Sequence, residues 1–196
     1  MTCGCLCWDD GPVNENGAPV LYAIVTGARV ARDVDKLIDL AHADGWDVCV
    51  IASPNGRRFI DTDALAAKTG HPVRSEYKDP DSPDALPPAD GMIVAPITSN
   101  SLAKWAAGIS DTLPLGLLVE GVGLELPVVA VPFANRALIS FPAVQDAVHK
   151  LSQWGVAMLV EDTPHEPKSG GDAADRFPWA AAWQALLDDP RLSIPK

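Results

Sequence analysis

One stretch in the middle of the chain constrains its fold more than any other. The uncharged run of residues 93–97 is followed by four small polar residues, after which apolar side chains recur at helical spacing. This order predicts a buried strand, a tight loop and the start of a helix. Parallel sheets bind ligands at the carboxyl ends of their strands, so the loop residues Thr98, Ser99, Asn100 and Ser101 are candidate ligand contacts. The alternative is that Ser99 or Asn100 only caps the helix.

The chain before this stretch shows the same alternation. Residues 20–25 form a continuous apolar run, helical spacing follows until Gly45, and residues 48–52 form a second apolar run. A strand, a helix and a strand at this spacing predict a right-handed unit with parallel strands. Its first turn holds Gly27 and Ala28, and a glycine there permits a phosphate to approach the backbone closely. This turn lacks the three glycines of a dinucleotide-binding loop. Ser53, which follows the second strand, is either a hydrogen-bond donor to the phosphate or the cap of a short helix.

The remaining pattern extends this architecture. Strands are expected at 126–131 and 156–160, and helices at 62–68, 114–123, 143–154 and 179–187. Strands that alternate with helices predict an α/β protein with a Rossmann-like three-layer fold and a parallel sheet of about six strands. Asn135 follows the strand at 126–131, so four polar loops are expected to converge on one edge of the sheet. His71, in the loop after Gly70, is a further candidate for this crevice.

Size and charge bound the domain organisation and the partners. The 196 residues, 47% of them hydrophobic, predict one domain at 20–190, preceded by a flexible tail at 1–19 and containing a mobile segment at 161–176. A net charge of -11 argues against nucleic acid or an anionic membrane as a general partner. No apolar run or signal-peptide pattern is long enough for a membrane segment, which favours a cytoplasmic protein. Cys3, Cys5 and Cys7 lack partners at finger-like spacing, so no metal site is expected and their role stays open.

Two loops carry a resemblance to a known family. Residues 96–101 are similar to the family loop P-A-S-A-N-T, and residues 132–135 are similar to its motif P-x-M-N. Residues 104–113 also resemble the helix that follows the first of these loops. From about residue 20 to residue 160 the chain therefore resembles the homo-oligomeric flavin-containing cysteine decarboxylases. This family includes phosphopantothenoylcysteine decarboxylase and the peptidyl-cysteine decarboxylases of lantibiotic maturation.

The resemblance implies a flavin cofactor, FMN or alternatively FAD. It places the flavin phosphate against Gly27, Ala28 and Ser53 and the ring against residues 98–101, with Phe59 as a further cofactor contact. Asn135 becomes the catalytic candidate, which would meet the carboxylate or neighbouring amide of the substrate. Members of the family form homo-oligomers, trimers that often assemble into dodecamers. The flavin and a peptide or small cysteine-containing substrate then lie at subunit interfaces.

The active-site histidine of the family is the main departure. It precedes the proline of the first loop by about fifteen residues, and that register falls on Ser82, which has no nitrogen that titrates near neutral pH. One hypothesis is an FMN-dependent enzyme that decarboxylates or oxidises a cysteine-containing substrate, such as a peptide C-terminal cysteine. The alternative is a catalytically silent flavin-binding or regulatory subunit of a homologous decarboxylase. A flavin-free module of the same fold is the third reading.

Overall fold

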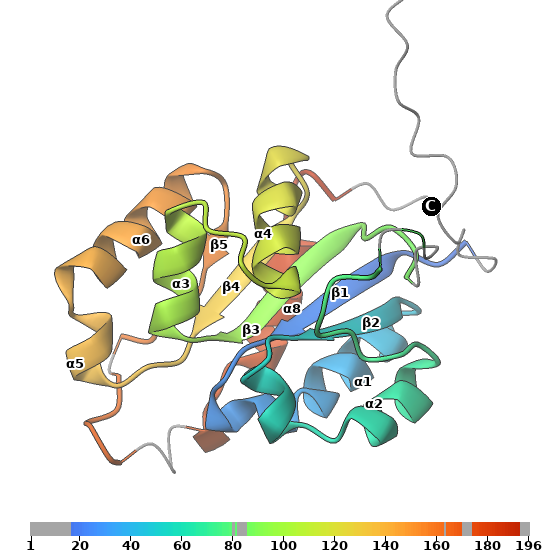
Figure 1. Cartoon of the computed structure of the whole chain (residues 1–196), viewed down its shortest axis with the longest axis horizontal. Helices are drawn as coiled ribbons and strands as arrows, with labels where there is room; N and C mark the ends of the chain where they lie inside the picture. Colours follow the sequence, from blue (N-terminus) through green and yellow to red (C-terminus); the bar gives the residue numbers. More distant parts are fainter. Residues whose placement is uncertain (1–16, 80, 82–85, 163, 170–173, 193–196) are drawn as a thin grey trace, which may run out of the picture.

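The computed structural model describes residues 17–79, 81, 86–162, 164–169 and 174–192, which form a three-layer α/β fold (Figure 1). Its sheet consists of parallel strands in the order β2-β1-β3-β4-β5. The strands are β1 (Val20–Val25), β2 (Asp47–Ala52), β3 (Gly91–Ile97), β4 (Val128–Pro132) and β5 (Ala157–Met158). The predicted Rossmann-like architecture is confirmed, and each predicted strand overlaps an observed one.

The described sheet has five strands, whereas about six were expected. Beyond β2, a single parallel bridge pairs Ile51 with Arg74. The Arg74 amide donates to the Val50 carbonyl (3.1 Å), and the Ala52 amide donates to the Arg74 carbonyl (2.8 Å). Pro72 lies just before this bridge and has no N–H to continue a ladder. The segment therefore contributes one bridge and no strand.

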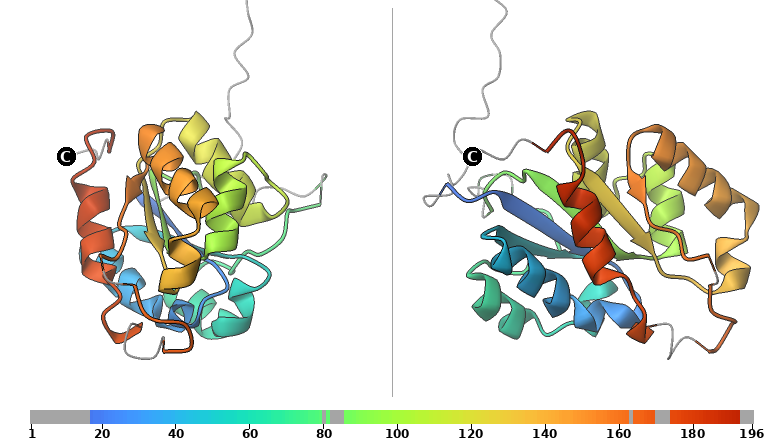
Figure 2. Two further views of the ribbon diagram at one scale, coloured as in Figure 1. Left: turned by 90° about the vertical axis from the view of Figure 1, so that its left-hand side faces the viewer. Right: turned by 180° about the vertical axis from the view of Figure 1, so that it is seen from behind.

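Both faces of the sheet are buried, which explains why the strands read as unbroken apolar runs. On one face, Leu21 and Val25 belong to a core with α1 (Asp35–Ala43) and α8 (Trp179–Leu187). On the other face, Ile24 and Val94 belong to a core with helices α3, α4 and α6. Their bounds are Ser99–Ala106 for α3, Leu113–Gly123 for α4 and Pro142–Gln153 for α6. Figure 2 shows α8 on the side of the sheet opposite α3, α4 and α6.

The first predicted helix is in fact two helices. A 3-10 helix, η1 (Arg29–Asp33), comes first, and α1 begins after Val34. The tighter turn brings Val30, Ala31 and Val34 all into the core directly after the β1 loop. Three further short helices are η2 (Gly56–Phe59), α2 (Thr62–Thr69) and α5 (Arg136–Ile139). None of the helices in the described ranges is long and apolar enough to cross a membrane.

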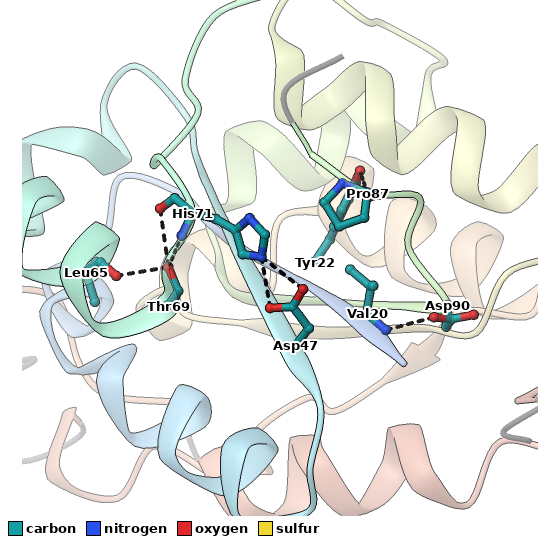
Figure 3. A network of polar contacts seen from close by, with 8 residues as sticks. All are labelled: Val20, Tyr22, Asp47, Leu65, Thr69, His71, Pro87 and Asp90. Atoms are coloured by element: carbon teal, nitrogen blue, oxygen red, sulfur yellow. Dashed lines mark hydrogen bonds and ion pairs between the residues drawn. The ribbon is translucent and has the colours of Figure 1, made fainter. Parts of the chain in front are cut away.

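The amino ends of β1 and β2 carry a polar network of their own (Figure 3). His71 Nε2 lies 2.9 Å from both carboxylate oxygens of Asp47, the first residue of β2. The Val20 amide donates to Asp90 Oδ2 (2.7 Å), and the Tyr22 hydroxyl donates to the Pro87 carbonyl (2.8 Å). His71 therefore lies at the end of β2 away from the predicted crevice, because residue 47 starts the strand. The structure therefore does not bring His71 to the crevice, which the sequence had offered only as the less favoured of its two placements.

Candidate functional site

The carboxyl edge of the sheet is held together by Thr26, the residue that follows β1. Its hydroxyl donates to the Pro96 carbonyl oxygen (3.0 Å) and accepts from the Thr98 amide (2.8 Å). Its own amide donates to the same Pro96 oxygen (3.0 Å), and the residue is only 2% exposed. The turn after β1 and the loop after β3 are therefore fixed to each other, although about seventy residues separate them in the sequence.

The loops after β1 and β2 are in direct contact. A Cβ added to Gly27 would lie 2.8 Å from the Asn55 Cβ, so no side chain fits there without movement. The Ser53 amide donates to the Val25 carbonyl (2.9 Å), and Ser53 Oγ accepts from the Gly56 amide (2.9 Å). Ser53 thus caps the turn that leads into η2. The Ala28 amide donates to the Thr26 carbonyl (2.7 Å), so this predicted phosphate donor is engaged within its own turn.

The loop after β3 leads directly into α3, and Thr98 is the cap of that helix. Thr98 Oγ1 accepts from the Ser101 amide (3.4 Å) and donates to Ser101 Oγ (3.1 Å). The alternative that Ser99 or Asn100 is the cap was wrong. Among the described residues, the side chains of Ser99 and Asn100 have no hydrogen-bond partner, and their amides lie in the first turn, where no intrahelical acceptor exists. These two residues are the ones that remain available to a ligand.

The loop after β4 joins the same edge. The Phe133 amide donates to the Ile97 carbonyl (3.0 Å), which ties this loop to the end of β3. Asn135 is the cap of α5, and its Oδ1 accepts from the Leu138 amide (3.1 Å). The amide nitrogen of the half-buried Asn135 side chain keeps both protons free of any described acceptor. Four loops that the sequence placed at one edge are therefore linked in series, from β2 through β1 and β3 to β4.

Four arginines near these loops were not recognised from the sequence. Arg29 and Arg32 lie on η1, Arg57 and Arg58 lie on η2, and the two short helices are in contact. All four are exposed, and within the described chain none forms an ion pair with a carboxylate. Unpaired positive charge at one place in a chain with net charge -11 attracts anions to that place. We call these four residues the arginine surface.

The other predicted residues have different surroundings. Phe59, at the end of η2, is partly buried and packs against the core on the α1 face. Ser82 lies outside the described residues, as do Cys3, Cys5 and Cys7 and positions 163 and 170–173 of the segment expected to be mobile. In the part of the chain that is described, no group of three or more His, Cys, Asp or Glu side chains is arranged to hold a metal ion.

The chemistry of this edge suits a phosphate-bearing, carbonyl-rich ligand. Guanidinium groups bind phosphate through paired N–H donors, and the two contacting helices η1 and η2 carry four of them. Free amides at a helix start and the side chains of Ser99 and Asn100 can donate to carbonyl oxygens. The donor set therefore fits a flavin mononucleotide, which carries a phosphate at one end and ring carbonyls at the other.

Comparison with known proteins agrees with this reading. A family model described as Flavoprotein matches residues 12–175. The coenzyme A biosynthesis bifunctional protein CoaBC of Thermococcus kodakarensis is 28% identical over 148 residues, which are 73% of this chain and 36% of that protein. The chain thus spans about a third of the length of the bifunctional relatives it matches.

Solved structures agree with the fold. The epidermin biosynthesis protein EpiD from Staphylococcus aureus is 26% identical, with a TM-score of 0.60, over 71% of this chain and 81% of that one. The FMN-dependent cysteine decarboxylase SpaF has a TM-score of 0.64 at 24% identity over 86% of this chain and 97% of that one, which supports the fold alone. Because the family model covers most of the sequence, the chain belongs to the flavoprotein family.

Proposed function

We propose that the chain binds FMN at the carboxyl edge of its sheet and uses it to decarboxylate a cysteine-containing substrate oxidatively, such as the C-terminal cysteine of a peptide. The observation that carries this proposal is the series of linked loops from Ser53 to Asn135 beside the arginine surface. Membership of the flavoprotein family supports the cofactor, and a Streptococcus mutans relative named as a probable phosphopantothenoylcysteine decarboxylase, 26% identical over 129 residues, supports the reaction class.

In this proposal each group at the edge has a separate task. The arginine surface and Ser53 bind the terminal phosphate of FMN, which carries up to two negative charges. Ser99 and Asn100 donate to the ring carbonyls and fix the orientation of the ring. Asn135 offers its free amide protons to the carboxylate or neighbouring amide of the substrate. The flavin, when bound, supplies the two-electron oxidation, and the protein supplies binding and orientation.

A second function is a catalytically silent flavin-binding or regulatory subunit that acts with a homologous decarboxylase. The observation that favours it is Ser82, which stands at the register of the family histidine and cannot accept a proton near neutral pH as imidazole does. It predicts a protein that binds FMN but turns over no substrate until a histidine-bearing homologue is added.

The test begins with the absorption spectrum of the purified protein after addition of FMN. A peptide that ends in cysteine is then mixed with the loaded protein, with a matched peptide that ends in serine as the control. Oxidative decarboxylation removes carbon dioxide and two hydrogens, a loss of about 46 Da that mass spectrometry detects. A flavin-loaded protein that changes no cysteine peptide alone, but does so with the homologue, would favour the silent subunit. A protein that does not bind FMN would contradict both functions.

We also propose that the site is completed by further copies of the chain, as a trimer or dodecamer. Leu138 donates its amide to Asn135, Phe141 donates its amide to the Leu138 carbonyl, and the two residues are 48% and 60% exposed, which leaves two large apolar side chains uncovered near the α5 cap. Apolar side chains in such a position are typical of an interface. Light scattering on the native protein and on a Phe141→Asp variant tests this, because the variant should form smaller particles.

A further inference from the structure

A pocket of about 690 Å³ lies away from the proposed flavin site, where α3, α4 and α6 end. These three helices cover the same face of the sheet (Figure 1). Gly121, in the last turn of α4, lies against Met92 and Val128, which are at the starts of β3 and β4. The pocket is thus at the amino edge of the sheet, opposite Ser99 and Asn100. Its size is typical of a cavity for a small molecule.

Much of the pocket wall is apolar. Val119 and Val122 come from α4, Trp105 comes from α3, and Trp154 directly follows α6. Trp154 is 43% exposed, and Lys150 fixes its ring, because the Lys150 Nζ lies 5.0 Å from the ring centroid and donates to the last carbonyl of α3 (2.8 Å). A fixed, exposed indole beside aliphatic side chains can bind an apolar group with little loss of side-chain freedom.

Two hydrogen-bond donors of the wall have no partner among the described residues. Trp105 is only 1% exposed, yet its indole N–H is not one of the fully buried unpaired groups, so this nitrogen reaches the pocket that the ring lines. Arg191 donates from Nε and Nη2 to Asp189 (2.9 and 2.6 Å) and from Nη2 to the Gly155 carbonyl (2.7 Å), which leaves Nη1 unused. Unused N–H donors of this kind suit a carboxylate of a ligand.

Glu125 adds a negative charge to the same wall. It follows the cap of α4 with a φ of 57°, a left-handed conformation in which glycine is the usual residue. Its side chain is exposed and forms no hydrogen bond or ion pair within the described chain. The pKa of Arg191 is raised chiefly by its hydrogen bond to Asp189, and the charge of Glu125 raises it further, so the two groups are near each other. An unpaired carboxylate at a strained backbone position points to a role for its charge.

The ends of the three helices add negative potential to the pocket. Lys150 donates to the Ala106 carbonyl at the end of α3, and Arg191 donates to the Gly155 carbonyl in the turn after α6, so both of these ends already have a cation. Of the described Lys and Arg side chains, none lies in the last turn of α4 or bonds its carbonyls, and Glu125 makes this end more negative. The end of α4 therefore favours a cation from a ligand.

We propose that this pocket binds a free α-amino acid with an aromatic side chain. The ammonium group binds Glu125 and the end of α4, the carboxylate binds Arg191 Nη1 and the indole N–H of Trp105, and the ring packs on Trp154 and the two valines. Glu125 and Arg191 are close enough to influence each other, which fits two ligand charges on one carbon atom. This inference does not depend on the flavin or on a cysteine substrate, because the pocket is at the other edge of the sheet.

The test is a titration of the full chain with L-phenylalanine, followed by the indole N–H signals of Trp105 and Trp154 in NMR spectra. We expect a Kd of about 1 mM or below. Two analogues, 3-phenylpropionate and 2-phenylethylamine, each lack one charge and should bind at least about tenfold more weakly, because a charged group of the wall is left unpaired. The indole N–H of Trp183 should not shift, since it lies on the opposite face of the sheet and is bonded to Asp44 Oδ2 (2.6 Å).

Two substitutions of Glu125 assign the ammonium contact. Glu125→Gln should weaken phenylalanine binding about tenfold and leave 3-phenylpropionate, which has no ammonium group, within about twofold of its native Kd. Glu125→Gly should weaken phenylalanine equally and yet be at least as stable in urea, because glycine adopts the left-handed conformation freely. The matched control is Glu120→Gln, at an exposed position of α4 outside the pocket wall, which should change neither Kd.

Three results would overturn the proposal. The first is that phenylalanine shifts neither of the two pocket indole signals. The second is that both Glu125 variants bind phenylalanine as tightly as the native protein does. The third is that Trp154→Ala forms smaller particles than the native protein in light scattering, because copies of the chain would then cover the pocket. Unchanged particle size in this variant supports a pocket that is open to a small molecule.

Discussion

The contact between Gly27 and Asn55 gives a quantitative test of the linked loops. In Gly27→Ala the new Cβ would lie 2.8 Å from the Asn55 Cβ. Carbon atoms normally approach to about 3.5–4.0 Å, so one loop must move by roughly 0.7 Å. Overpacking of this kind costs about 1–3 kcal/mol. The loss of glycine freedom in the unfolded chain returns about 0.4–1 kcal/mol, so a net loss of about 1 kcal/mol in unfolding free energy is expected.

A double-mutant cycle isolates this contact. Asn55→Gly removes the opposing Cβ, so Gly27→Ala should be harmless in that background, with a coupling energy of about 1–3 kcal/mol. Urea unfolding of the native protein, both single variants and the double variant measures the coupling. FMN titration should show weaker binding in Gly27→Ala and recovery in the double variant. If Gly27→Ala is as stable as the native protein, or if Asn55→Gly gives no relief, the direct contact between the two loops is refuted.

Three further results are expected. Thr26→Val leaves the Thr98 amide without its acceptor, so the unfolding free energy measured in urea should fall by about 1–3 kcal/mol. Thr26→Ser keeps the hydroxyl oxygen, so its unfolding free energy should fall by less than half of that amount. Joint replacement of Arg57 and Arg58 by Gln should weaken FMN binding about tenfold or more at low salt and less at high salt, whereas Lys36→Gln on α1 should not; equal effects would argue against the arginine surface. Burial, with a smaller contribution from the charge of Asp47, raises the pKa of Cys49 from 9.0 to about 12, so the unfolded chain gives up this proton first. Unfolding free energy should therefore fall as pH rises from about 9 to about 12, and in a variant without the three tail cysteines a thiol reagent at pH 8 should label the protein only as it unfolds.

The elements of the fold were readable because the strands are buried on both faces. Such strands appear as uncharged runs, and residues 20–25 and 93–97 match β1 and β3 closely. The extent of the last strand was not readable, since only Ala157 and Met158 pair with β4. The break at Val34 was also missed, because 3-10 and α-helices bury similar apolar positions over one turn. Periodicity locates elements, whereas hydrogen bonding decides their ends.

The candidate site was readable as a set of loops but not as a set of contacts. The position of Asn135 after a strand was enough to place it at the edge. The bonds of Thr26 to Pro96 and Thr98 depend on β1 lying beside β3, a pairing that no local pattern contains. The arginine surface was missed because exposed charged residues usually only contact solvent. Adding up the charges in the segment after each predicted strand, and comparing each sum with the net charge of -11 for the whole chain, would have revealed it.

The position of β1 between β2 and β3 has a consequence for synthesis of the protein on the ribosome. At about 5–20 residues per second, residues 91–97 follow residue 52 after about 2–9 s. Throughout that interval, the edge of β1 that later pairs with β3 has backbone N–H and C=O groups without partners. An exposed apolar edge strand of this kind can pair with a strand of another chain. Slow codons between positions 53 and 90 would lengthen this exposure. Chaperones that bind extended apolar segments would reduce the pairing of β1 with other chains during it. We therefore expect the yield of folded protein to depend on how quickly the third strand emerges.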